Sequence, residues 1–329
     1  MRRPKTLQAF TPEQRTKVHE LLAIRVAYMM GRKFEEADWA DVYCAAKGIP
    51  KKGWSNLNID IMHGLLGVEH KMLCYRSKPD LREACGTSPM HPAATRAIRM
   101  PPTTTPADEA MRDVLGQYAQ LIEDRTESVR RNAAVRGDPD MRVGWLLWQE
   151  SLRQFMYFEE EMLAPNADEY RAEWVDSGGG TRKKSRNLWI YEKETGKKRY
   201  SVTTEAGAKV QPYFDVPPPG DPHLYHFVVI GEAIDARHVR VWVTESTYEE
   251  LERLIGDLRT EPLSKTILAV TGELSVSDSP GDIASECGRA LTVTAEAYQV
   301  LSAAVCGVND DHTFRLLVRH LRQRKLRLR

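Results

Sequence analysis

The feature that decides the fold is a short apolar stretch interrupted by charged residues, IDIMHGLLGVEHKML at residues 59–73. Glycines at both ends of 64–67 predict a turn, with a short strand before it and a second strand over 68–75. Side chains alternate between the two faces of a strand, so Glu69 and Lys71 are expected to share a face. The stretch therefore predicts a β-hairpin that presents charged groups.

The charged residues of this hairpin suit metal-assisted hydrolysis. Asp60 and Glu69 offer hard oxygen ligands for a divalent cation that keeps part of its water shell. With an ammonium beside them, they suit the attack of water on a phosphodiester. Carboxylates buried in an apolar stretch cost roughly several kcal/mol without a metal or a cation. A structural ion pair is the alternative interpretation, because short Glu-x-Lys sequences recur by chance.

Together these residues resemble the PD-(D/E)xK nuclease superfamily, which includes many type II restriction endonucleases. Asp60 matches the strand-borne aspartate and Glu69-His70-Lys71 matches the (D/E)xK element, while Ile59 stands where the motif has its proline. The segment 31–35 resembles the helix with an acidic residue that leads into the sheet in that family. The resemblance is confined to residues 31–71 of the 329.

The resemblance implies a role for each matched residue. Asp60, Glu69 and the backbone carbonyl of His70 would bind Mg²⁺, which lowers the pKa of a bound water and offsets charge that grows on the phosphate. Lys71 would orient the attacking water and stabilise the transition state. Glu35 would bind a second metal or orient a ligand. The His70 ring is expected on the opposite face of the strand, as a packed residue rather than a base.

The fold class implied by the resemblance is α/β (α+β), a restriction-endonuclease-like mixed β-sheet core flanked by helices. The implied activity is that of a type II site-specific deoxyribonuclease, which cleaves double-stranded DNA to 5′-phosphate and 3′-hydroxyl ends with Mg²⁺. A homodimer is expected, because two-fold symmetry matches a palindromic site. Two alternatives stay open: a repair or mobile-element nuclease of the same fold, and a non-catalytic nucleic-acid-binding protein.

The length of the chain allows one large or two modest domains. Helical segments and the catalytic motif are predicted over 1–176, and a β-rich part with C-terminal helices is predicted over 181–329. The glycine-rich segment 177–180 separates them. The second part is expected to complete the sheet or contact DNA, and a single domain is the alternative. No internal repeat is evident.

Helical and strand periodicities predict the remaining elements. Thr11 and Pro12 begin a helical region that runs to residue 47, with a break at Gly31. Further helices are expected at 107–135, 139–163, 246–259, 280–305 and 311–327. A hairpin is expected over 188–202, and further strands at 225–230, 239–244 and 266–270.

Basic residues concentrate in two segments of a chain whose formal net charge is only +1. The segment 182–199 has eight cations, two carboxylates and interleaved aromatic residues. It predicts a hairpin that tracks phosphates or enters a major groove, and a solvated loop is the alternative. The expected DNA contacts there are Arg182, Lys183, Lys184, Arg186, Lys197 and Lys198. The tail 312–329 predicts a basic amphipathic helix that binds nucleic acid or docks on the protein.

A loop after the first hairpin also has groups suited to DNA. Residues 76–107 are expected to be irregular, because they are rich in proline and threonine. Within them, hydroxyls, a histidine, Arg96 and Arg99 suit base edges and phosphates. A purely structural loop is the alternative interpretation.

The composition limits the compartment and the chemistry. The five cysteines form no CxxC pair, which argues against a cysteine zinc site and for reduced thiols in a cytosolic protein. No apolar h-region follows the basic start, so no signal peptide is expected, and no apolar run approaches the ~18 residues that span a bilayer. A cytoplasmic protein without membrane contact is therefore expected. No Gly-x-Ser-x-Gly or phosphate-binding glycine loop occurs, and the histidines do not cluster.

Overall fold

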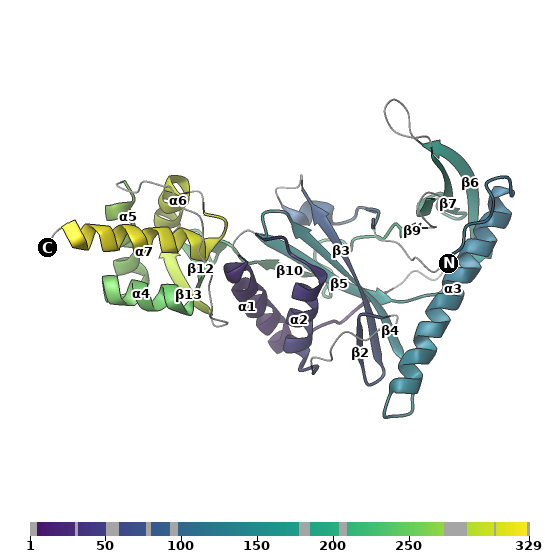
Figure 1. Ribbon diagram of the computed structural model, residues 1–329, viewed down its shortest axis with the longest axis horizontal. Coiled ribbons are helices and arrows are strands. Elements are labelled where there is room, and N and C mark those ends of the chain that lie inside the picture. Colours follow the sequence, from purple (N-terminus) through teal and green to yellow (C-terminus); the bar gives the residue numbers. More distant parts are fainter. Residues whose placement is uncertain are drawn as a thin grey trace. The chain divides into compact units, whose positions relative to one another are not determined.

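The computed structural model describes residues 5–29, 32–50, 59–76, 80–92, 98–177, 185–203, 209–272, 288–305 and 307–327 (Figure 1). Within these ranges the chain forms seven α-helices, thirteen strands and two short 3-10 helices, Leu81–Ala84 and Ala167–Glu169. The predicted α/β class, a β-sheet core flanked by helices, is confirmed. None of the described helices combines the length and the apolar character needed to cross a membrane.

The chain divides into two compact units, each built from three separate segments. The first unit consists of Met1–Ala9, Lys52–Leu147 and Met156–Tyr225. The second consists of Phe10–Lys51, Trp148–Phe155 and His226–Arg329. The boundary expected between 176 and 181 lies inside the first unit.

A six-stranded sheet contains the predicted hairpin. Its main path has the order β1-β5-β4-β3-β2, and β10 pairs with β5 outside this path. The strands are β1 (Thr6–Leu7), β2 (Ile61–His63), β3 (Leu66–Tyr75), β4 (Asp140–Gln149), β5 (Gln154–Glu161) and β10 (Tyr225–Val228). β2 and β3 are antiparallel, and Gly64 makes the turn between them with a φ of 58°. This left-handed conformation favours glycine, and the hairpin prediction is confirmed.

The helix expected over 139–163 is wrong, because this segment forms β4 and β5. Leu152, in the short connection between the two strands, has a left-handed φ of 59°. All residues of 145–148 and 155–158 are buried. Strands covered on both faces have nearly continuous apolar runs, which periodicity does not separate from a buried helix.

The second sheet of the first unit is an antiparallel meander that packs on a long helix. Its strands are, in order, β6 (Tyr170–Ser177), β7 (Ser185–Glu192), β8 (Lys198–Thr203) and β9 (Lys209–Pro212). One face buries Leu188, Ile190 and Val202 in a core with Val114 and Leu115 of α3 (Ala107–Asn132). The helix predicted over 107–135 and the hairpin predicted over 188–202 are both confirmed.

The second unit contains the N-terminal helices and a three-stranded sheet with its helices. α1 (Pro12–Tyr28) begins after Thr11, whose hydroxyl accepts the Gln14 N–H, and α2 (Glu36–Lys47) ends at a left-handed Gly48. These two helices confirm the predicted helical region, and Gly31, where the break is predicted, lies outside the described residues. The remaining elements are β11 (Glu232–Ala233), β12 (His238–Thr244), α4 (Glu245–Ile255), α5 (Thr260–Thr271), β13 (Gly288–Thr294), α6 (Ala295–Ala304) and α7 (Asp310–Arg327).

Two predictions in this unit are wrong. Residues 266–270, expected as a strand, belong to α5, and residues 288–294, expected inside a helix, form β13. In α5 the β-branched Thr266 donates its hydroxyl hydrogen to the Pro262 carbonyl one turn earlier, which the helix allows at little cost. In β13 only Leu291 and Val293 join the core, so the alternation is too short to stand out in the sequence.

The segments β12-α4-α5 and β13-α6-α7 form an internal repeat, which corrects the expectation of none. β12 and β13 are antiparallel, with Val241 opposite Leu291, so an approximate two-fold axis passes through this pair. Thr244 and Thr294 are the N-caps of α4 and α6, and each accepts the backbone N–H three residues further on. Val243, Thr244, Tyr248 and Leu251 recur as Val293, Thr294, Tyr298 and Leu301, each 50 positions further along the chain, so the sequence carries a short signal of this repeat.

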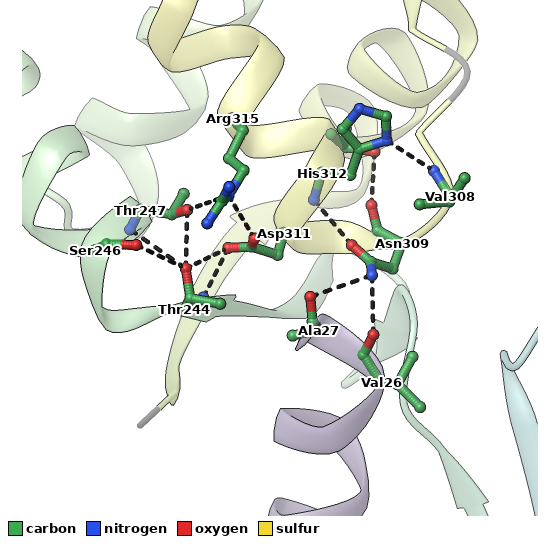
Figure 2. Close-up of polar contacts among 11 residues, drawn as sticks. Val26, Ala27, Thr244, Ser246, Thr247, Val308, Asn309, Asp311, His312 and Arg315 are labelled. Atoms are coloured by element: carbon green, nitrogen blue, oxygen red, sulfur yellow. Dashed lines mark hydrogen bonds and ion pairs between the residues drawn. The ribbon is translucent and has the colours of Figure 1, made fainter. Parts of the chain in front are cut away.

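A buried polar cluster fixes the start of α7 (Figure 2). Asp311 is fully buried and accepts hydrogen bonds from the Thr244 backbone N–H at 2.7 Å and the Thr244 hydroxyl at 2.9 Å. The same carboxylate pairs with Arg315 at 2.8 Å. Asn309 donates to the Val26 carbonyl at 2.8 Å. Side-chain hydrogen bonds therefore tie β12, α1 and α7 together.

Candidate active site

The turn of the predicted hairpin folds the chain back, so that Asp60 lies beside His70 in β3. Asp60 lies directly before β2 rather than on a strand, and it is exposed. Its Oδ2 accepts a 2.6 Å hydrogen bond from the backbone N–H of His70. The carboxylate is therefore held beside the residue that separates Glu69 from Lys71.

Glu69 and Lys71 share one face of β3, as the strand alternation predicts. The Lys71 ammonium donates to Glu69 Oε1 at 2.5 Å. Arg125, which comes from α3, donates to the same oxygen at 3.3 Å. Glu69 is buried, and two cations offset its charge, as a buried carboxylate requires.

Arg125 is a site residue that is not among those predicted from the hairpin motif. It lies on the inward side of α3, between Ile122 and Val129, which are both buried. Residues three and four positions apart share a helix face. An arginine within this apolar stripe is the signal that could have identified it.

A cavity of about 540 Å³ lies beside the Glu69–Lys71 pair. Its volume falls in the range of ligand-binding sites. Residues of the first unit that line it include Glu69, Lys71, Tyr118, Arg125, Trp145, Glu160, Arg199, Tyr213 and Asp215. Burial raises the pKa of Tyr118, although the charges of Lys71 and Arg125 oppose the increase. The cavity thus places charged groups of both signs among aromatic rings.

Glu160 is a second carboxylate of this cavity that the sequence analysis does not identify. Burial raises its pKa to about 7, and the charge of Asp215 adds to the increase. A 3.0 Å hydrogen bond from Trp145 Nε1 and the charge of Arg199 act in the opposite direction. A carboxyl group that titrates near neutral pH can exchange a proton with a ligand in the cavity.

His70 and Glu35 lie in different environments. His70 is buried, and its ring centroid lies 6.0 Å from that of Tyr157, which is the environment of a packed residue. Glu35 belongs to the second unit, whereas Asp60 and Glu69 belong to the first. Glu35 directly precedes α2, where its backbone N–H donates to Asp38 at 2.9 Å.

The residues predicted to bind DNA fall into two groups. Arg96, Arg182, Lys183 and Lys184 lie outside the described residues. Arg186 pairs with Asp176 at 3.8 Å, and Lys197 pairs with Asp215 at 3.7 Å. Arg99 is exposed, and its backbone is hydrogen-bonded to the Gln117 side chain. Lys198 places its ammonium 3.2 Å from the centroid of the Trp189 ring.

The basic tail forms α7 and docks on its own unit. Phe314, Leu317 and Val318 are buried in the core of that unit. Arg315 pairs with Asp311, and Arg322 contacts Glu250. The apolar stripe of the tail is therefore used for packing, which was one of its two expected roles.

The donor chemistry of the hairpin fits Mg²⁺. Within the described ranges, no group of three or more His, Cys, Asp or Glu side chains is placed to hold a metal ion. The predicted set needs only two side chains, Asp60 and Glu69, with the carbonyl of His70. Proteins bind Mg²⁺ through one or two carboxylates while water completes the shell. Asp60 is exposed, and Glu69 lines the cavity.

One hairpin, one helix and one cavity make up this candidate site. Asp60, Glu69 and Lys71 come from the hairpin, and Arg125 comes from the helix. The arrangement can bind a divalent cation and an anionic ligand. No family model, curated protein or solved structure matches the chain.

Proposed function

We propose that this protein is a Mg²⁺-dependent endonuclease that cleaves double-stranded DNA at a specific sequence, as a type II restriction endonuclease does. The β2–β3 hairpin carries the proposal, because the hydrogen bond from His70 to Asp60 holds a carboxylate beside the Glu69–Lys71 pair. Two carboxylates and an ammonium suit hydrolysis of a phosphodiester. The resemblance to PD-(D/E)xK nucleases supports duplex DNA as the substrate.

Each residue has its own role in the proposed reaction. Asp60, Glu69 and the His70 carbonyl would hold Mg²⁺, which supplies an acidified water and positive charge beside the phosphate. Lys71 orients the attacking water and donates to the phosphate oxygen on which negative charge grows. Arg125 orients the Glu69 carboxylate, because its guanidinium reaches the same oxygen as Lys71.

A non-catalytic nucleic-acid-binding protein is the second candidate. It is favoured by the two cations on Glu69, since Lys71 and Arg125 satisfy a buried carboxylate without a metal. In that case Glu69, Lys71 and Arg125 stabilise the contact between β3 and α3, and the protein hydrolyses no DNA. A repair nuclease of the same fold would share the site and differ in its products.

Plasmid cleavage by the full chain with Mg²⁺ tests the proposal. We expect discrete fragments from the wild type and intact plasmid with Lys71→Ala, because the ammonium acts on the transition state. Lys265→Ala is the matched control, since Lys265 is an exposed residue of α5 in the other unit. It should cleave as the wild type does. Thermal melting followed by circular dichroism shows whether each variant is folded.

The products separate the candidates. A smear in place of discrete fragments would assign the chain to a non-specific or repair nuclease. If the Lys71→Ala variant still cleaves plasmid, the proposed catalytic site in the β2–β3 hairpin is wrong. DNA binding without cleavage by the wild type would favour the non-catalytic candidate.

A further inference from the structure

The sheet β6–β9 has a second face, opposite the one that packs on α3. Side chains alternate along each strand, so this outer face consists of the residues between those of the core. We define the outer face by its exposed and partly exposed residues Arg171, Glu173, Trp189, Tyr191, Lys198 and Lys209. Asn187 and Ser201 also lie between core residues, but they are buried. A register shift after Ile190 brings Lys198 onto this face.

Cations and aromatic rings lie side by side on the outer face. The strand register places Arg171 opposite Tyr191, and Tyr191 opposite Lys198. The Lys198 ammonium lies 3.2 Å from the centroid of the Trp189 ring, and Arg171 Cζ lies 4.7 Å from that of the Tyr191 ring. Separations below about 6 Å mark cation–π interactions. Each cation is therefore held in place by a ring.

The side chains of these two cations are not directly bonded to a carboxylate of the described residues. The side chains of Arg171 and Lys198 form neither a hydrogen bond nor an ion pair with any of them, and the Glu173 carboxylate acts on Lys198 only through its charge. By contrast, the neighbouring Lys197 and Arg199 both pair with Asp215. The outer face thus keeps its cations available for an external anion.

The charge of the outer face is positive. Lys209 adds a third cation, on β9 opposite Thr203 of β8. The one carboxylate of the outer face is that of Glu173, which accepts the Tyr191 hydroxyl at 2.6 Å. Three cations against one carboxylate favour a polyanion.

We propose that the outer face binds the phosphate backbone of duplex DNA. The identity of this polyanion rests on the proposed function. The Lys198 ammonium also lies 5.3 Å from the centroid of the Tyr213 ring, and Tyr213 lines the cavity that Glu69 and Lys71 share. DNA on the outer face therefore adjoins the candidate active site. Cations on a folded surface fix the register of a duplex through its phosphates.

An anionic membrane also presents phosphates, but the outer face suits DNA better. A membrane-binding surface needs apolar side chains that enter the lipid. Trp189 and Tyr191 are partly buried, and cations lie over their rings. Their apolar surface is therefore engaged within the protein.

Fluorescence anisotropy with a labelled duplex, in EDTA and over a salt series, tests the inference. We expect Arg171→Gln with Lys198→Gln to weaken binding about tenfold, and to reduce the slope of log K against log[salt] by about 2, since each phosphate contact contributes about 0.9. Glu173→Gln keeps an acceptor for Tyr191 and removes the one carboxylate. It should tighten binding about threefold, a change that a folding defect does not produce.

The matched control is Arg112→Gln with Arg130→Gln, which removes the same charge from α3 and should bind as the wild type does. Both arginines pair with carboxylates, Asp168 and Glu127. Unchanged affinity and slope in the outer-face variant would overturn the inference. Preferential binding of phosphatidylserine vesicles would do so as well. If the chain binds DNA through the outer face but leaves plasmid intact, the inference about the outer face would stand and the proposed nuclease activity would be overturned.

Discussion

Glu160 connects the chemistry of the cavity to the stability of the protein. Its pKa is about 7 in the folded chain, against 4.5 for an ordinary glutamate. Between these values the folded state binds more protons than the unfolded state, so the free energy of unfolding falls as pH rises through this window. The full decrease corresponds to about 3 kcal/mol. We expect urea denaturation to show it and Glu160→Gln to remove it.

Asp310 provides the comparison for that measurement. It is buried, accepts hydrogen bonds from the Gly231 N–H at 3.0 Å and the Tyr298 hydroxyl at 2.9 Å, and has a pKa that burial raises to about 6. Asp310→Asn should therefore flatten the lower part of the pH window and keep the decrease near pH 7. A decrease near pH 7 that persists in Glu160→Gln would show that another group causes it.

Sequence reasoning at the residue scale succeeds where the residues are close along the chain. Strand alternation and one glycine turn are enough to place Glu69 and Lys71 together. Arg125 reaches the same oxygen from 56 residues away, so only the tertiary fold brings it there. The pKa of Glu160 depends on burial by distant segments, which no local pattern measures.

At the scale of elements, the predictions hold where a helix or strand has one buried face. α3 buries a stripe that includes Val114 and Ile122, and its helical period is visible in the sequence. β4 and β5 bury every residue over 145–148 and 155–158, so no alternation between buried and exposed residues is visible there. In β13 the second and third residues, Arg289 and Ala290, are both exposed, which leaves too short an alternation to recognise.

The contacts at the two equivalent strand ends of the internal repeat differ. We therefore expect substitutions there to lower the free energy of unfolding by different amounts. Asp311→Ala removes both hydrogen bonds to Thr244 and leaves Arg315 without its carboxylate partner, with the Thr247 hydroxyl as its remaining hydrogen-bond partner among the described residues, so we expect the free energy of unfolding to fall by about 3 kcal/mol. At the equivalent strand end, the Thr294 N–H donates only to Ser264, at 2.8 Å. Ser264→Ala should therefore cost about 1 kcal/mol. Urea denaturation at pH 7 measures both, and equal losses would contradict this account.

At the scale of the whole molecule, two hydrophobic cores each lie within a single unit. The core of the second unit gathers Val241, Leu291 and Leu317. The core between β6–β9 and α3 gathers Leu115 and Leu188. Neither cluster includes a described residue of the other unit. The repeat β12-α4-α5 and β13-α6-α7 explains how the second unit builds its core, since each copy covers the apolar face of the other.

Separate cores predict separate responses to substitution. Leu115→Ala should destabilise the first unit by about 2–5 kcal/mol and speed hydrogen exchange in β7 and β8, while the amides of β12 and β13 exchange at the wild-type rate. Asp311→Ala should speed hydrogen exchange in β12 and β13, while the amides of β7 and β8 exchange at the wild-type rate. Hydrogen exchange followed by mass spectrometry resolves the two sheets in one experiment. If either substitution speeds exchange equally in both sheets, the chain unfolds as one cooperative body. The prediction that the two units unfold independently would then be wrong.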